Sequence, residues 1–307
     1  MFIVILAQNY KIILTMNKIP ESELVLNPDG SVYHLKLRPE HIAETVIIVG
    51  DPHRVSMVSS YFDSIEYSIE NREFVTHTGY VGEKRLTVLS TGIGTDNIDI
   101  AINELDAAVN IDLKTRTVKE NFKSLKIIRL GTSGAVQEDI PCDSFVISSH
   151  GLGFDGLLNF YNVPKGIVDQ DLTNAFLSHS KWDNALPRPY IVAGSNILLK
   201  ELGKNMIQGI TATSPGFYGP QGRVLRLPLF DPYQNEKITS FGFAGLRITN
   251  YEMETSALYG LGKMLGHQTC TICAIIANRL AKTYSKDYKK TVDKMIGIVI
   301  ERLCEKP

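Results

Sequence analysis

Short apolar runs recur along this chain of 307 residues, and longer stretches with a helical spacing of apolar residues separate them. The runs at 46–49, 125–130 and 272–278 are nearly continuous, which is typical of strands buried on both faces of a sheet. At 98–108 and 257–265, apolar residues recur every three or four positions, as in amphipathic helices. This alternation, without a linker or repeat, predicts one α/β domain around a largely parallel or mixed sheet.

Other segments complete the expected order of elements. Residues 71–78 and 86–89 are expected to be strands, with Gly79 and Gly82 in the hairpin between them. Residues 231–241 are expected to form a helix, and residues 288–303 a terminal amphipathic helix.

Two glycine-rich segments follow predicted strands and lead directly into predicted helices. In the first, Gly50 ends the strand, Asp51 can cap the next helix and Pro52 suits its first position. The second spans residues 90–97 and carries hydroxyl side chains. Ligands of open α/β sheets bind at the carboxyl ends of the strands, so these junctions predict an anion site within reach of Arg54. An ordinary strand-to-helix junction is the alternative at residues 50–54.

Arg129 lies inside a third apolar strand that runs into Gly-Thr-Ser-Gly at residues 131–134. A guanidinium in such a strand is costly unless it is paired with an anion. Together with Thr132 and Ser133, it could grip a phosphate bidentately. A structural ion pair with a carboxylate is the alternative.

Two later segments carry further candidate chemistry. Residues 217–223 form a Gly/Pro-rich turn with Gln221 and Arg223, which suits a planar polar ligand such as the imide edge of uracil. An exposed surface turn is the alternative. Glu252, Met253 and Glu254 begin a predicted helix, where a carboxylate can accept from a sugar diol. Helix-start acids that complement the dipole are the alternative there.

The bulk composition excludes several classes of protein. A formal net charge of −1 provides no global attraction to nucleic acid or to an anionic membrane. The 44% hydrophobic and 21% charged content is ordinary for a soluble globular protein. Neither G-x-G-x-x-G nor G-x-x-x-x-G-K-[ST] occurs, so neither a dinucleotide nor a nucleoside triphosphate is indicated.

Four cysteines occur, of which Cys270 and Cys273 have C-x-x-C spacing within an apolar run. No second such pair accompanies them, so we interpret them as core residues and expect no metal site. No disulfide framework is indicated, which fits a reducing compartment, and we expect a cytoplasmic protein. Residues 1–15 are apolar but too short to span a bilayer. We interpret residues 1–16 as a tail or as the result of a start codon assigned too early.

Taken in order, several motifs resemble those of the purine-nucleoside/uridine phosphorylase family, over about residues 33–279. Residues 50–54 look like the family's first phosphate loop and residues 90–94 like its second glycine turn. Residues 129–134 look like its phosphate-binding Arg-x-Gly-Thr segment, and residues 250–255 like its ribose-binding segment. Residues 217–223 look like the base clamp of the uridine-cleaving members, which the chain resembles most.

This resemblance implies a single nucleoside phosphorylase domain over residues 17–307. The implied fold is a three-layer α/β/α arrangement with a mixed, partly barrel-like central sheet flanked by helices. The implied reaction is the reversible phosphorolysis of uridine to uracil and ribose 1-phosphate, with inorganic phosphate as co-substrate and no organic cofactor.

The family's site residues carry over onto matching positions of this chain. The resemblance implies phosphate binding by Gly50, Arg54, Arg72, Arg129 and Thr132. It implies ribose binding by His34, Met253 and Glu254, and base binding by Phe217, Gln221 and Arg223. Of these, Arg129, Gln221 and Arg223 are expected to act in catalysis.

Oligomerisation and a cation are also implied. Arg72 and His34 match residues that family members lend to a neighbouring subunit, which implies a homodimer or a hexamer built as a trimer of dimers. Relatives hold a monovalent cation near a position equivalent to Glu73. No nucleic-acid or membrane partner is expected.

Departures from the family pattern bear on specificity. Residues 219–223 read Gly-Pro-Gln-Gly-Arg, where the family often has Pro-Gly-Gln-x-Arg. Purine-specific relatives carry an Asp where this chain has Asn278 and Arg279, which disfavours purines. Hydrolytic relatives generally lack the phosphate-binding arginines, so Arg54 and Arg129 favour phosphorolysis. A broad-specificity phosphorylase, a phosphate-independent nucleosidase and a catalytically silent nucleoside-binding protein are the alternatives.

Overall fold

The computed structural model describes residues 18–305, so the interpretation of residues 1–16 lies outside the described residues. The helices are α2 (Pro52–Ser59), α3 (Thr95–Asn110), α4 (Gln170–Ser180), α5 (Asn196–Leu202), α6 (Gln234–Thr239), α7 (Thr255–Met264) and α8 (Tyr288–Cys304). Three short 3-10 helices are η1 (Pro39–His41), η2 (Leu157–Phe160) and η3 (Gly219–Gln221).

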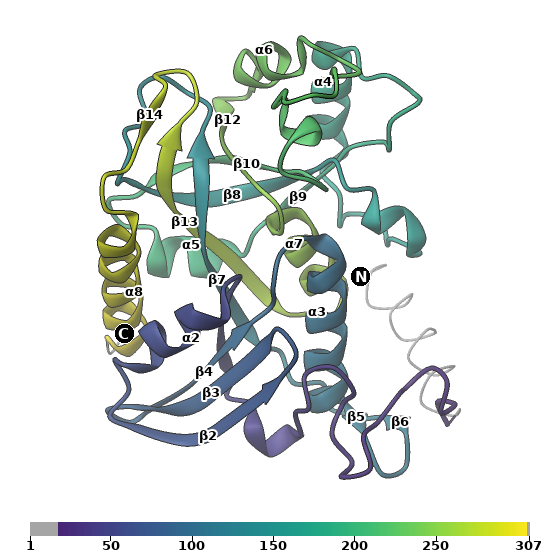
Figure 1. Cartoon of the computed structure of the whole chain (residues 1–307). Helices are drawn as coiled ribbons and strands as arrows, with labels where there is room; N and C mark the ends of the chain where they lie inside the picture. The colour runs from purple at the N-terminus through teal and green to yellow at the C-terminus, as the bar shows by residue number, and fades with distance from the viewer. Residues whose placement is uncertain (1–17, 306–307) are drawn as a thin grey trace.

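The strands alternate with these helices through most of the chain (Figure 1). They are β1 (Thr45–Val49), β2 (Ser64–Asn71), β3 (Phe74–Val81), β4 (Lys84–Ser90), β5 (Ile111–Asp112), β6 (Thr117–Val118), β7 (Lys126–Ala135), β8 (Phe145–Gly153), β9 (Tyr190–Ala193), β10 (Ile207–Thr213), β11 (Gly242–Phe243), β12 (Leu246–Glu252), β13 (Gln268–Asn278) and β14 (Thr283–Tyr284).

Twelve strands form one mixed sheet, with the order β11-β12-β10-β8-β13-β7-β1-β4-β3-β2 and with β9 and β14 paired to β8 and β13. β12 also pairs with β7, where Tyr251 lies opposite Gly134. Strands β12, β10, β8, β13 and β7 therefore close into a ring. The predicted mixed and partly barrel-like sheet is confirmed.

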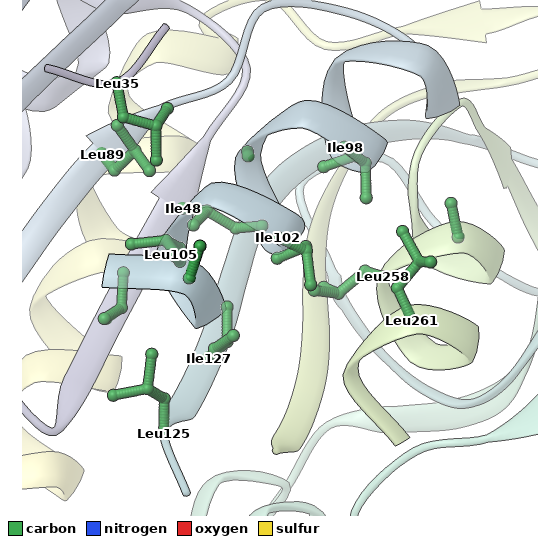
Figure 2. Packing of buried hydrophobic residues seen from close by; sticks show 14 of the residues in the cluster. Leu35, Ile48, Leu89, Ile98, Ile102, Leu105, Leu125, Ile127, Leu258 and Leu261 are labelled. Carbon is green, nitrogen blue, oxygen red and sulfur yellow. The ribbon is translucent and has the colours of Figure 1, made fainter. Parts of the chain in front are cut away.

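Helices cover both faces of the sheet, because successive residues of a strand point to opposite faces. Ile48 of β1 packs into a cluster with Ile102 of α3 and Leu258 of α7 (Figure 2). The preceding residue, Ile47, packs into a second cluster with residues of α2, α5 and α8, such as Met295. The expected three layers follow from this alternation.

The first hairpin differs from the prediction. Residues 71–78 are not one strand, because β2 ends at Asn71 and β3 begins at Phe74. Arg72 occupies the turn between them with a φ of +55°. The prediction missed β2 because this edge strand is mostly exposed and lacks the continuous apolar run of the central strands. Gly79 lies within β3 and not in a hairpin turn, since it pairs with Ile65 of β2 and Leu86 of β4.

The boundaries of other strands and helices also differ from the prediction. β7 continues beyond the predicted strand at 125–130 through residues 131–134, because β13 pairs with it along that stretch. α6 is shorter than the predicted 231–241 helix, since Asp231 Oδ1 accepts the Tyr233 N–H in a turn before it. Cys270 and Cys273 are buried within β13, as the core interpretation predicted. Within residues 18–305, no helix is both long and apolar enough to cross a membrane.

Candidate active site

Three strand ends meet at one edge of the sheet. β1 pairs in parallel with β4 and β7, so Val49 lies beside Ser90 and Ile48 beside Arg129. The two glycine-rich junctions are in contact, since a Cβ at Gly50 would lie 3.2 Å from Gly92 O. The parallel register thus brings together three segments that the sequence singled out separately.

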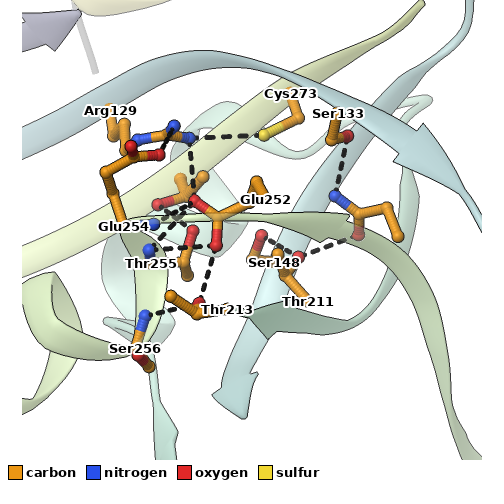
Figure 3. Close-up of polar contacts among 12 residues, drawn as sticks. Arg129, Ser133, Ser148, Thr211, Thr213, Glu252, Glu254, Thr255, Ser256 and Cys273 are labelled. Carbon is orange, nitrogen blue, oxygen red and sulfur yellow. Dashed lines mark hydrogen bonds and ion pairs between the residues drawn. The ribbon is translucent and has the colours of Figure 1, made fainter. Parts of the chain in front are cut away.

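A buried ion-pair cluster lies at this edge (Figure 3). Arg129, whose side chain is 6% exposed, contacts Glu254 through Nη2 and Glu252 through Nη1, the latter at 3.2 Å. Burial works against the charge of Arg129, but Glu254 and Glu252 together raise its pKa above the ordinary value. Burial also raises the pKa of the nearby Cys273 thiol to about 11, so this thiol is neutral near pH 7. The carboxylate pairing considered as the alternative for Arg129 is present, and its role toward phosphate stays a prediction.

Glu252 anchors this cluster, although it was not among the predicted site residues. Its Oε1 accepts from Thr213 Oγ1 at 2.6 Å. Its Oε2 accepts the backbone N–H groups of Glu254 and Thr255 at 2.9 and 3.0 Å. These N–H groups begin α7, where the helix dipole favours a carboxylate. The sequence shows two neighbouring acids, and only the parallel pairing of β10 with β12 reveals which one is structural.

Glu254 joins the cluster to the second glycine-rich junction. Its Oε1 accepts the Gly94 N–H at 2.8 Å, while its Oε2 faces Arg129. Burial raises the pKa of Glu254, and Arg129 opposes that shift. Gly131 allows the guanidinium to fold back over β7, because a Cβ there would lie 2.1 Å from Arg129 Nη1. Half-buried Met253 occupies the turn before Glu254.

Arg54 adds a second guanidinium near the first. Asp51 caps α2 by accepting the His53 N–H at 2.9 Å, as the sequence predicted. Arg54 Nη1 donates to Leu130 O at 3.2 Å. Burial lowers the pKa of Arg54, and the positive charge of Arg129 adds to that shift. Two cationic groups that repel each other favour an anion between or beside them.

Residues 217–223 form a compact clamp after β10. Arg223 Nη1 donates to Phe217 O at 2.6 Å and to Gln221 Oε1 at 2.5 Å. The Arg223 guanidinium also lies 3.8 Å from the centroid of the Phe217 ring. The three predicted base-binding residues therefore contact one another, with Phe217 stacked on Arg223. Gln221 is buried within the loop, whereas Phe217 and Tyr218 are exposed, so the base-binding role of this loop stays a prediction.

Arg279 supports the clamp from the end of β13. Its Nη1 donates to Gln221 O at 2.5 Å, and its guanidinium lies 5.7 Å from the Tyr251 ring centroid. Burial lowers the pKa of Arg223, and Arg279 adds to that shift. In the sequence, Arg279 was considered only because purine-specific relatives carry an Asp at Asn278 and Arg279, and this contact was not predicted. Its contact with the clamp joins residues that are 58 positions apart along the chain.

The clamp and the ion-pair cluster are physically connected. Ser214 N donates to Glu252 O at 3.0 Å, and Ser214 Oγ donates to Pro220 O at 3.3 Å. Gln234, the first residue of α6, donates to the same Pro220 carbonyl at 2.6 Å. The clamp is therefore held between β12 and α6.

His34 and Arg72 lie on two segments that contact each other. Asn71 Nδ2 donates to His34 O at 2.8 Å, and the Arg72 guanidinium lies 5.8 Å from the Tyr33 ring centroid. Within residues 18–305, no hydrogen bond or ion pair joins His34 or Arg72 to the clamp or to the Arg129 cluster. The sharing of His34 and Arg72 between subunits stays a prediction.

The remaining predicted positions lie near the same edge. Thr132 is half-buried on β7, three residues beyond Arg129. Glu73 lies in the β2–β3 turn, where its backbone carbonyl accepts from Ser90 Oγ at 2.6 Å. Among the described residues, no group of three or more His, Cys, Asp or Glu side chains could hold a metal ion.

Comparison with known proteins identifies the family. A family model described as the phosphorylase superfamily matches residues 44–305. A Trypanosoma brucei nucleoside phosphorylase structure with uridine phosphorylase activity has a TM-score of 0.83 and 30% identity, covering 91% of this chain and 99% of that chain. A Thermococcus kodakarensis uridine phosphorylase is 28% identical over 94% of this chain and 93% of its own length. A Streptococcus suis DeoD-type purine nucleoside phosphorylase is 27% identical over 88% of this chain and 98% of its own length. This chain belongs to the phosphorylase superfamily.

Proposed function

We propose that this chain is a uridine phosphorylase, which converts uridine and phosphate reversibly to uracil and ribose 1-phosphate. The observation that carries this proposal is the pairing of Gln221 with Arg223 at 2.5 Å. An amide and a guanidinium side by side present both donors and an acceptor, which suits the C=O/N–H/C=O edge of uracil. Arg279 contacts Gln221, and Asn278 and Arg279 stand where the family resemblance places the Asp of purine-specific relatives.

Phosphate would bind where the cationic groups gather. Arg54 and Arg129 supply guanidinium groups, while Gly50 and Thr132 supply a backbone N–H and a hydroxyl near them. A guanidinium has five N–H donors, so Arg129 has donors beyond those that face its two carboxylates. Arg72 would come from a neighbouring subunit.

The chemical step requires no covalent enzyme intermediate. A phosphate oxygen would form the new bond to C1′ as the C1′–N1 bond breaks, and the electron pair of that bond would leave with uracil. The hydrogen of the phosphate would end on the uracil N1. Gln221 and Arg223 would stabilise the charge that develops on the uracil oxygens. Bound phosphate would stabilise the positive charge on the sugar, and positioning makes the attack effectively intramolecular.

Ribose would bind between the phosphate and the clamp. Glu254 can accept hydrogen bonds from the vicinal diol, and Met253 can pack on the apolar face of the sugar. The carboxylate of Glu254 already contacts Arg129, so the same two residues would link the sugar to the phosphate.

The reaction class is tested by uracil release from uridine with and without phosphate. We expect release only with phosphate, together with ribose 1-phosphate as the second product. Equal release in both conditions would mean hydrolysis. Uridine binding without any release would indicate a nucleoside-binding protein.

Base specificity is tested at the clamp. Arg223→Ala should lower kcat/KM for uridine by about 10²- to 10³-fold, the usual effect of removing one donor to a developing negative charge. Arg226→Ala, an exposed arginine three residues further on, is the matched control and should keep normal activity. Cleavage of inosine as fast as uridine would instead favour a broad-specificity nucleoside phosphorylase.

We also propose a homodimer, or a hexamer built from dimers, in which His34 and Arg72 complete a neighbouring site. Arg72→Ala and Arg223→Ala should each be inactive. If Arg72 acts across the interface, co-assembled mixtures of the two should recover about a quarter of the wild-type activity, because half of the random dimers contain one intact site. No recovery in verified mixed dimers would place Arg72 in its own subunit's site.

Two further proposals complete the picture. A monovalent cation would bind near Glu73, and activity should then differ between potassium and a bulky organic cation as counter-ion, with Glu73→Gln abolishing the difference.

The protein would be cytoplasmic, in keeping with four cysteines that form no disulfide. Cell fractionation tests this location.

A further inference from the structure

A carboxylate on α3 holds the segment that carries His34. Glu104 Oε1 lies 2.6 Å from His34 Nδ1, and Glu104 Oε2 accepts the backbone N–H groups of His34 and Leu35 at 2.9 and 2.8 Å. The Glu104 side chain is 17% exposed and that of His34 is 29% exposed. One carboxylate therefore restrains both the main chain and the ring of His34.

These contacts determine which ring nitrogen faces outward. An ionised carboxylate can only accept, so Nδ1 of His34 carries the hydrogen in this contact. Nε2 of a neutral ring is then the hydrogen-bond acceptor. Tyr33 makes an edge contact with the imidazole at 4.8 Å between centroids, and Phe74 makes another at 6.4 Å. The ring is thus restrained on several sides, with Nε2 turned away from Glu104.

Within residues 18–305, the Glu104 side chain forms hydrogen bonds only with His34 and Leu35 and none with the Arg129 cluster. The same segment is tied to the β2–β3 turn, because Asn71 Nδ2 donates to His34 O. Exposed Arg72 follows Asn71 in that turn. Glu104 therefore supports a surface unit that presents one imidazole acceptor and one guanidinium.

We infer that Glu104 is a positioning residue, which orients His34 so that Nε2 accepts a hydrogen bond from a ribose hydroxyl in the neighbouring subunit's site. This inference rests on the proposed function and on the proposed sharing of His34. A ribonucleoside has three ribose hydroxyls, and the vicinal pair suits the Glu254 carboxylate. The primary 5′-hydroxyl is the one left for His34.

The experiment compares uridine with 5′-deoxyuridine, which lacks that hydroxyl. Glu104→Ala should lower kcat/KM for uridine by about 5- to 10-fold, the typical worth of one hydrogen bond. The same variant should change kcat/KM for 5′-deoxyuridine less than about twofold. Glu66→Ala is the matched control. Glu66 of β2 forms an ion pair with Arg85 of β4 at 2.7 Å, so its loss should change kcat/KM for neither substrate.

Two kinetic outcomes overturn the inference. An equal fall for both substrates would show that Glu104 only maintains the fold, and no fall for either would show that it has no role. If Glu104→Ala does not fold, Glu104→Asp keeps the charge but shortens the side chain, and the same comparison between substrates applies.

A spectroscopic measurement decides the inference independently of activity. NMR spectra of the protein with ¹⁵N-labelled histidine report which ring nitrogen carries the hydrogen, and the His34→Gln variant assigns the His34 signals. In the wild type, His34 should carry a hydrogen on Nδ1 and none on Nε2. Glu104→Ala should lose this preference. A wild-type His34 that carries its hydrogen on Nε2 would contradict the inference, whereas absence of uridine cleavage by the wild type would contradict only the proposed function.

Discussion

The Arg129 cluster and the clamp at residues 217–223 each present a guanidinium, but different parts of the fold hold them. Arg129 lies on a central strand, and its carboxylate partners are placed by the pairing of β10, β12 and β7. Arg223 lies on a loop and donates to groups of that same loop. The contacts of Arg129 depend on the whole sheet, whereas the hydrogen bonds that Arg223 itself donates are local. Substitutions should therefore change stability and activity together in the cluster, and mainly base recognition in the clamp.

The largest effect is expected for Arg129→Met. It leaves Glu252 and Glu254 buried without their cation, so the free energy of unfolding should fall by about 3–5 kcal/mol. Phosphorolysis should be lost as well. Arg247→Met is the control, because Arg247 forms an exposed pair with Asp139 worth about 0–1 kcal/mol. Urea unfolding of both variants measures the difference, and similar losses would show that the buried ion pairs of the cluster stabilise the fold no more than an exposed pair does.

A smaller effect is expected for Gly131→Ala. The added Cβ would displace Arg129 Nη1, so kcat/KM should fall by about 10²-fold while stability falls by about 1–3 kcal/mol. In the control Gly242→Ala, the nearest atom to the new Cβ is Leu246 O at 3.7 Å, an ordinary contact. Steady-state kinetics and urea unfolding test both. Normal activity of Gly131→Ala would show that the position of the guanidinium is not critical.

In the clamp, Gly222→Ala should act on the base and not on phosphate. Gly222 has a φ of +67°, and a Cβ there would lie 2.3 Å from Asn235 Nδ2, so the cost is about 1–2 kcal/mol. The KM for uridine should rise while the KM for phosphate stays unchanged. Gly219→Ala in the same loop has no atom within 4 Å of the new Cβ and is the control. A parallel rise in both KM values would mean that clamp and cluster respond as one unit.

The smallest effect concerns the ion pair between Asp231, just before α6, and Lys237 of α6. A hydrogen bond from Lys237 at 2.7 Å lowers the pKa of Asp231. Because the folded pKa lies below the unfolded value, this contribution is complete above about pH 4 and is lost as the pH falls through the folded pKa. Asp231→Asn should therefore cost about 0–1 kcal/mol near neutral pH and nothing in acid. Urea unfolding at both pH values measures it, and a cost that persists in acid would point to a different role.

Several features of this site could be predicted because they depend on neighbouring residues. The cap of α2 by Asp51 and the first-turn position of Pro52 follow from backbone geometry alone. The apolar runs identified the central strands because those strands are buried on both faces. The exposed strand β2 has no such pattern and was missed for that reason.

Other features required the three-dimensional arrangement. Glu252 and Glu254 are separated by one residue and look alike in sequence. Strand pairing places Glu252 where it accepts hydrogen bonds from Thr213 and from the backbone at the start of α7. Glu254 instead contacts Gly94 and Arg129. Local sequence could not distinguish the two because their partners come from distant segments.

The sequence by itself therefore determined the α/β class, the glycine-rich strand ends and the amide-guanidinium pair of the clamp, since short-range periodicity and turn chemistry encode them. Only the tertiary structure decided that Arg129 is paired with two carboxylates, that Arg279 supports Gln221, and that Glu104 holds His34. The physical reason is that a buried charge or polar group is stable only with partners, and those partners are supplied by strands and helices far away along the chain.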